Sequence, residues 1–131
     1  MKYLFDSSAI FKAIKNNAVE VLAGNYTLEL ARYELGNILW KEHTLHRRIS
    51  DKEVKELIKL VREVLSVMNV VNVNGYESKV LDVAIKLKLT FYDASYVYLA
   101  KEKGLSLVTE DTRLLSKAGS YLRVMRLSDV I

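Results

Sequence analysis

Three aspartates in this sequence each follow a short apolar segment that is predicted to form a β-strand. The pairs are Lys2–Phe5 with Asp6, Leu89–Phe91 with Asp93, and Leu105–Val108 with Asp111. If these strands are parallel, their carboxyl ends share one edge of the sheet, and the aspartates become neighbours despite their distance in sequence. Carboxylates that converge repel one another, and a bound cation relieves that repulsion. Such hard oxygen ligands select Mg²⁺ or Mn²⁺, so the expected chemistry is metal-assisted hydrolysis of a phosphodiester.

A fourth acid, Glu34, interrupts an apolar helical pattern. Leu30 and Ile38 lie four residues to either side of it, and Asn37 shares the same helix face. Burial of an unpaired carboxylate is costly, so either a basic residue pairs with Glu34 or its side chain points into a polar cleft. We expect Glu34 to join the three aspartates, with Asn37 in a supporting position.

Each of these acids also has an ordinary structural explanation. Asp93 and Asp111 are at expected helix starts, where aspartate is a favoured N-cap. Asp6 suits a turn after a strand. Glu34 suits a salt bridge, because charged side chains are rarely buried without a partner. The structural explanation is the simpler one for any single acid, whereas the complete set favours a metal site.

The segments around these acids alternate between predicted strands and predicted helices. Further strands are expected at Tyr26–Leu28, Asn69–Val73 and Tyr121–Leu127. Helices are expected at Ser8–Lys15, at Val19–Ala23, from Glu29, from the capping box of Ser50 and Glu53, at Tyr76–Leu87, from Asp93 to Gly104, and from Asp111 to Gly119. This alternation favours an α/β fold with a mostly parallel sheet and helices on both faces.

Composition narrows the class of protein. The chain has 131 residues, half of them hydrophobic, and is expected to form a single domain over residues 1–131. It has no cysteine and only two histidines, which excludes disulfides, thiol catalysis and cysteine zinc sites. No signal segment or membrane-length apolar run is present, so a cytoplasmic location is expected. The net charge of +4 suits a polyanionic partner.

Other phosphate chemistries lack their motifs. The sequence has no G-x-x-x-x-G-K-[ST] loop and no G-x-G-x-x-G after its first strand. Asp6 is not followed two residues later by the second acid that an aspartyl-phosphate phosphatase is expected to carry.

Four segments together carry a family resemblance. They are YLFDSSAIFKAI, ARYELGNILWK, TFYDASYVYLAKEKG and LVTEDTRLLSKAG. In this order and at these distances they resemble the four acidic motifs of PIN-domain ribonucleases. Within that family, the chain looks most like the small VapC-type toxins of toxin–antitoxin pairs.

The resemblance implies a three-layer α/β/α domain and assigns roles to individual residues. It implies that Mg²⁺, with Mn²⁺ as a substitute, is held by Asp6, Glu34, Asp93 and Asp111. It implies that the hydroxyl groups of Ser8 and Thr109 support these carboxylates. Glu110, beside the last acid, is treated as solvent-facing, because adjacent residues at a helix start point in different directions.

The implied activity is endonucleolytic cleavage of RNA that leaves a 5′-phosphate and a 3′-hydroxyl. The implied partners are a small antitoxin, which occupies the active-site cleft, and a second copy of the chain in a homodimer. The alternative is a module that binds RNA or a protein partner without turnover. The complete set of acids argues against that alternative.

A basic segment, WKEHTLHRRIS, follows the Glu34 helix. One explanation is that its cations compensate the dipole at the helix C-terminus. The other is contact with the RNA backbone. The candidates for such contact are Lys41, Arg47 and Arg48, with Lys12 and Lys15 on the first helix. Trp40, at the start of the segment, is either a core residue or part of a surface that binds a partner. The core is favoured, since large aromatic side chains are usually buried.

Overall fold

The computed structural model describes residues 2–131, which form a five-stranded parallel sheet. The strands are β1 (Tyr3–Phe5), β2 (Tyr26–Leu28), β3 (Asn69–Val71), β4 (Ser106–Val108) and β5 (Val124–Met125). Their order across the sheet is β3-β2-β1-β4-β5. Because all the strands run in one direction, their carboxyl ends lie at one edge, as the sequence predicts.

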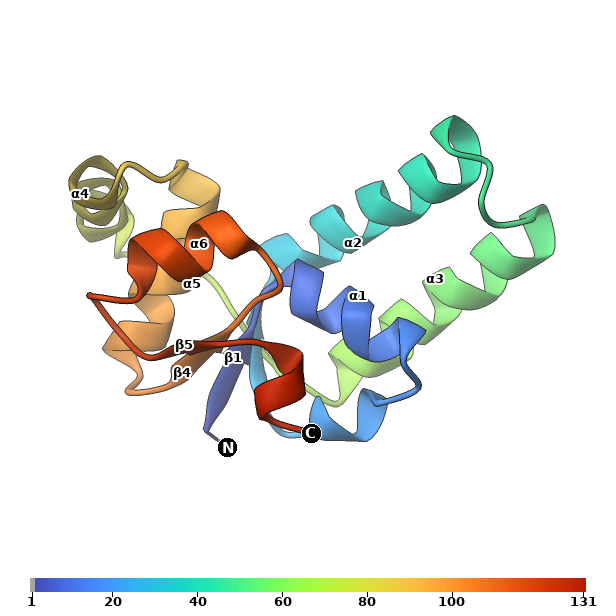
Figure 1. The fold of residues 1–131 in the computed structure, drawn as a ribbon, viewed down its shortest axis with the longest axis horizontal. Helices are drawn as coiled ribbons and strands as arrows, with labels where there is room; N and C mark the ends of the chain where they lie inside the picture. Colours follow the sequence, from blue (N-terminus) through green and yellow to red (C-terminus); the bar gives the residue numbers. More distant parts are fainter. Residues whose placement is uncertain (1) are drawn as a thin grey trace.

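Six α-helices connect the strands and cover the sheet. They are α1 (Ser7–Lys15), α2 (Leu30–Trp40), α3 (Asp51–Ser66), α4 (Glu77–Leu87), α5 (Phe91–Glu102) and α6 (Thr112–Ala118). Shorter helical turns are η1 (Val19–Val21), the π-helical η2 (Lys41–Leu45) and η3 (Leu127–Asp129). Helices α1, α2 and α3 lie on one side of the sheet and α4, α5 and α6 on the other (Figure 1). This is the predicted three-layer α/β/α fold.

The chain reverses its direction across the sheet between β1 and β4. From β1 it passes outward to β2 and β3, and after α4 and α5 it returns to β4 and continues to β5. Open parallel sheets bind their ligands at such a switch point, beyond the carboxyl ends of the strands. Asp6 lies at this point, and its backbone N–H donates to the carbonyl of Val108 at 3.1 Å.

Strands β1 and β4, which meet at the switch point, are buried on both faces. Leu4, Phe5, Leu107 and Val108 have no exposed surface, which explains why both segments are continuously apolar. Helix α5 is buried from Ala94 to Ala100, since it lies between the sheet and α4. The elements that carry the switch point therefore belong to the hydrophobic core.

The Ser50 capping box is present. Its hydroxyl accepts from the Glu53 N–H at 3.1 Å, and the Glu53 carboxylate accepts from the Ser50 N–H at 2.9 Å. It starts α3, which packs against α2 in a helical hairpin that extends away from the sheet (Figure 1). No helix within residues 2–131 is long and apolar enough to cross a membrane.

Two sequence-based expectations are wrong. Leu89–Phe91 is not a strand: Lys88 adopts a left-handed conformation with φ of 57°, and α5 begins at Phe91 after the N-cap Thr90. This tight reversal leaves no extended segment before Asp93. Trp40 is not in the core but is 49% exposed, because it lies at the end of α2 where the hairpin leaves the sheet.

Candidate active site

Asp6 is the most deeply buried acid at the switch point. It is the N-cap of α1, and its Oδ1 accepts from the Ala9 N–H at 2.9 Å and from the Ser8 hydroxyl at 2.6 Å. Its Oδ2 accepts from the Thr109 hydroxyl. Only 6% of the residue is exposed. The carboxylate is therefore held rigidly by two hydroxyl groups and one backbone amide.

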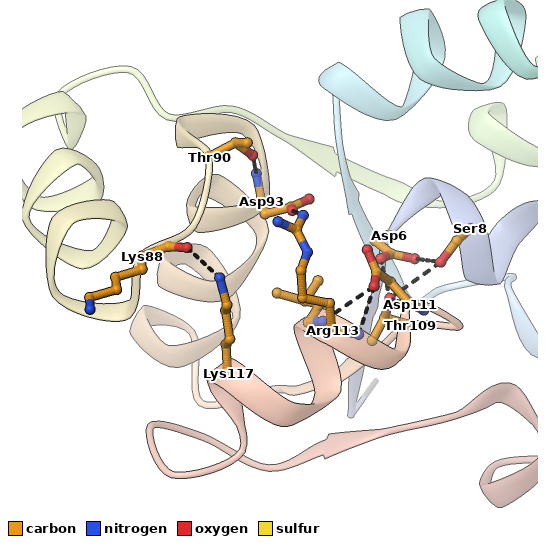
Figure 2. A network of polar contacts seen from close by, with 10 residues as sticks. Asp6, Ser8, Lys88, Thr90, Asp93, Thr109, Asp111, Arg113 and Lys117 are labelled. Carbon is orange, nitrogen blue, oxygen red and sulfur yellow. Dashed lines mark hydrogen bonds and ion pairs between the residues drawn. The ribbon is translucent and has the colours of Figure 1, made fainter.

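The same two hydroxyl groups fasten the turn after β4 to the start of α1. The Ser8 hydroxyl accepts from the Glu110 N–H at 2.9 Å. The Thr109 hydroxyl accepts from the Asp111 N–H at 3.1 Å, and both side chains are shown in Figure 2. The Ser8 and Thr109 oxygens are 3.3 Å apart. Because of this network, Asp6 and Asp111 keep fixed positions relative to each other.

Asp111 is the N-cap of α6. Its Oδ1 accepts from the backbone N–H groups of Arg113 at 2.9 Å and Leu114 at 3.3 Å. The capping explanation is thus correct for Asp111 and also holds for Asp6. Capping does not exclude a role at the site, since a carboxylate has acceptor positions beyond those that the helix uses.

Asp93 reaches the switch point from the first turn of α5 and is not a cap. Its backbone N–H donates to the hydroxyl of the cap, Thr90, at 3.1 Å. Its Oδ2 lies 3.3 Å from Nη2 of Arg113, and the side chain is 23% exposed. The ion pair joins α5 to α6 across 20 positions in the sequence.

Glu34 comes from the opposite side of the sheet, on α2. It is half-buried, and its Oε1 accepts from the Tyr96 hydroxyl at 2.6 Å. No lysine or arginine within residues 2–131 forms an ion pair with Glu34, so the salt-bridge explanation is not correct for the described chain. Burial of Tyr96, together with this hydrogen bond, raises the pKa of its phenol well above the usual range. Asn37, one turn further along α2, is exposed.

The four acids influence one another electrostatically. Burial raises the pKa of Asp6 to about 6 against the opposing effect of its hydrogen bonds, and the charge on Asp93 raises it further. Burial also raises the pKa of Asp93, as do the charges of Asp111 and Glu34, whereas Arg113 lowers it. In such a field a proton or another cation is favoured at the site.

These acids have the donor chemistry for a hard divalent cation, but they do not form a closed ligand set. No group of three or more acidic or histidine side chains within residues 2–131 is placed to hold one metal ion. Three contacts engage two of these acids: Asp6 accepts from Ser8 and Thr109, and Asp93 pairs with Arg113. The residues fit a metal by their chemistry, and the ion pair with Arg113 occupies an oxygen of Asp93 that a metal would use.

The segment at the tip of the α2–α3 hairpin, with three of the residues predicted to bind RNA, lies far from α5 and α6 (Figure 1). These residues, Lys41, Arg47 and Arg48, are exposed. The other two, Lys12 and Lys15, are exposed on α1. The structure thus brings the four acids and the two hydroxyl residues together but does not bring the cations of the hairpin tip to them.

Two residues of the site, Tyr96 and Arg113, are not among those predicted from the sequence, and the prediction for Glu110 is wrong. Glu110 is half-buried, and its Oε2 accepts from the Leu127 N–H at 2.8 Å, so it anchors the turn after β5 instead of facing solvent. Tyr96 lies one helical turn after Asp93, a spacing that places both on one side of α5. Arg113 lies in the first turn of α6, where a cation opposes the helix dipole. That unfavourable position is a signal that sequence reasoning can use.

The comparisons with known proteins agree with this fold. The sequence model of the PIN domain matches residues 3–120. The chain belongs to the PIN domain family.

Two relatives of the chain are VapC proteins of Pyrobaculum aerophilum. Exonuclease VapC9 is 39% identical over 95% of this chain and 91% of its own length, and Ribonuclease VapC3 is 32% identical over 89% of this chain and 95% of its own. The crystal structure of PAE2754 from the same organism superposes with a TM-score of 0.81 at 31% identity. That match covers 98% of this chain and 91% of PAE2754.

Proposed function

We propose that this chain is a metal-dependent ribonuclease of the VapC type and that Asp6, Glu34, Asp93 and Asp111 are its metal ligands. The observation that carries the proposal is the gathering of these acids, from four separate segments, at the switch point of the sheet. Its relatives named as an exonuclease and a ribonuclease support a nuclease activity. The proposed ion is Mg²⁺, with Mn²⁺ as a substitute, because both favour carboxylate and water ligands.

The proposed role of each residue follows from how deeply its side chain is buried. A bound Mg²⁺ ion supplies an activated water and neutralises charge at the phosphate. Asp6 is fixed by Ser8 and Thr109, so it serves as the anchoring ligand. The remaining acids are less buried and lie on the substrate side, where Tyr96 orients Glu34. Their shared negative field favours cation binding and repels RNA unless a cation is present.

We propose that the chain cuts within an RNA strand and leaves a 5′-phosphate and a 3′-hydroxyl. The printed names of the relatives differ on this point, since one is an exonuclease and the other a ribonuclease. A circular RNA separates the two modes, because it has no end from which an exonuclease can start.

The test is cleavage of matched linear and circular RNAs by wild type and by Asp93→Asn, with Mg²⁺ or with excess chelator. The expected result is cleavage of both RNAs by wild type in Mg²⁺ only, and no cleavage by the variant. Cleavage of the linear RNA alone would indicate an exonuclease. Undiminished activity in chelator would overturn the metal mechanism. RNA binding without any cleavage would indicate the non-catalytic module.

The proposed protein partners are a small antitoxin and a second copy of the chain. Relatedness to VapC proteins supports the antitoxin. Large apolar side chains exposed on the hairpin, Tyr33 at 71%, Trp40 at 49% and Leu45 at 57%, support protein contacts there.

A further inference from the structure

Arg113 is the basic residue that contacts two of the four acids. Its backbone N–H donates to Oδ1 of Asp111 at 2.9 Å, and its guanidinium Nη2 lies 3.3 Å from Oδ2 of Asp93. Figure 2 shows the side chain extending from α6 toward Asp93. No other lysine or arginine within residues 2–131 forms an ion pair with any of the four acids.

The position of Arg113 in its helix is unfavourable without those acids. It is the second residue of α6, in the first turn, where the helix dipole gives a positive partial charge. A cation in this turn destabilises a helix, whereas a cation in the last turn stabilises it. The negative field of the four acids offsets that cost. The position of the arginine is therefore favoured by the acids of the site and not by the helix dipole.

We propose that Arg113 is the internal counter-ion of the acidic site: it neutralises Asp93 in the metal-free protein, leaves Asp93 when a divalent cation binds, and then contacts a phosphate of the RNA. This inference rests on the proposed function of the acids. It deepens that function by assigning to one residue both a competition with the metal and a contact with the substrate.

The geometry permits such an exchange. The Arg113 side chain is 55% exposed, so it can leave Asp93 without disturbing the core. A divalent cation carries twice the charge of a guanidinium, and both compete for the same carboxylate oxygen. Once released, a guanidinium beside the metal can form paired hydrogen bonds with a phosphate. In the absence of a metal the ion pair occupies Oδ2 of Asp93, an oxygen that the metal would use.

The experiment compares Arg113→Gln and Arg113→Lys with Lys117→Gln as a matched control. Lys117 lies on the same helix but donates to the Lys88 carbonyl at 2.8 Å, outside the acidic site (Figure 2). Mn²⁺ affinity is measured by calorimetry without RNA. Arg113→Gln is expected to bind Mn²⁺ about three- to tenfold more tightly than wild type, with a smaller gain at high salt. Arg113→Lys and Lys117→Gln are expected to bind Mn²⁺ as wild type does.

Thermal melting and cleavage complete the test. In chelator, Arg113→Gln is expected to melt about 2–4 °C below wild type, and saturating Mg²⁺ is expected to remove the difference. At saturating Mg²⁺ the same variant is expected to show a higher KM for RNA, and Arg113→Lys is expected to restore part of the loss.

Two results overturn the inference. One is an Arg113→Gln affinity for Mn²⁺ equal to or weaker than that of wild type. The other is a melting deficit that is the same with chelator and with Mg²⁺, as an ordinary structural ion pair would give. If wild type binds Mn²⁺ and cleaves RNA while either result holds, only the role of Arg113 fails. If wild type neither binds Mn²⁺ nor cleaves RNA, the proposed function fails.

Discussion

The switch point of the sheet and the tip of the α2–α3 hairpin carry charge in opposite ways. At the switch point, acids are partly or wholly buried, and the pKa values of Asp6 and Asp93 are raised. At the tip, cations are exposed, and nearby acids already satisfy some of them: Arg48 pairs with Glu42 at 3.0 Å. The first region stores unfavourable electrostatic energy that a ligand can release. In the second region, nearby acids already neutralise part of the positive charge.

Because of this difference, we expect the switch point to carry the catalytic chemistry and the hairpin tip to contribute to RNA affinity. Strained, buried charge that is held by a rigid framework is typical of functional sites. Exposed charge with local partners contributes little to stability and acts on a polyanion through counterion release. Substitutions in the two regions should therefore produce different kinds of defect, and the three predictions below use that contrast.

The largest effect is expected from Asp111→Asn, which should reduce RNA cleavage by at least about 100-fold, or roughly 3 kcal/mol of transition-state stabilisation. The helix should remain intact, because asparagine is as good an N-cap as aspartate and keeps the acceptor for the Arg113 amide. Single-turnover cleavage at saturating Mg²⁺ measures the effect, with the melting temperature as a control for folding. Activity within about threefold of wild type would show that Asp111 only caps α6.

The same contrast explains how far the sequence predicted the molecule. The edge that carries Asp6 and Asp111 was predictable, since both residues follow apolar strands and parallel strands end at one edge. The capping role of Asp111 was predicted from residue type, whereas Asp6 was assigned to a turn and is an N-cap as well. Asp93 also reaches this edge, but by a different route from the predicted one. An apolar triplet such as Leu89–Phe91 has no periodicity to distinguish a strand from a helix start.

Contacts between side chains on distant segments could not be predicted. Tyr96 and Glu34 are 62 positions apart, and their hydrogen bond depends on how α2 and α5 face each other across the sheet edge. The exposure of Trp40 depends on the length by which the hairpin extends beyond the sheet. Residue type gives the usual burial of tryptophan but not the position of a helix end relative to the core.

A smaller effect, on stability, is expected from Asp6→Asn in metal-free buffer. The folded pKa of Asp6, about 6, is above the reference value of 3.8, so the folded state holds the proton more tightly than the unfolded state. The contribution of Asp6 to the free energy of unfolding of wild type should therefore fall as the pH rises from about 4 to about 6, then level off. The variant lacks this titration, and above pH 6 it should be more stable by about 1–2 kcal/mol.

Thermal or urea unfolding between pH 4 and pH 8, in chelator, measures that difference. Asp6→Ala is the control, since it also removes the titration but loses the cap on the Ala9 amide, and it should be about 1 kcal/mol less stable than Asp6→Asn. Added Mg²⁺ should stabilise wild type more than Asp6→Asn. A variant that is less stable than wild type at every pH would make Asp6 a structural cap rather than a strained ligand.

The smallest effect is expected at the hairpin tip, where Arg47→Glu with Arg48→Glu should weaken RNA binding by about three- to tenfold at low salt. Both arginines are exposed, so their phosphate contacts would act mainly through counterion release, and the dependence of affinity on salt should become less steep. The loss should be modest, since Glu42 already neutralises Arg48 in the free protein.

Affinity is measured in the Asp111→Asn background, so that the RNA is not cut, over a range of salt concentrations. The matched control is Lys79→Glu with Lys86→Glu on α4, which changes the net charge equally at exposed positions on the other side of the sheet. An equal loss in both double variants would mean that net charge, and not the hairpin tip, attracts RNA. An unchanged affinity and salt slope for the tip variant would leave its cations with the other explanation, compensation of the dipole at the end of α2.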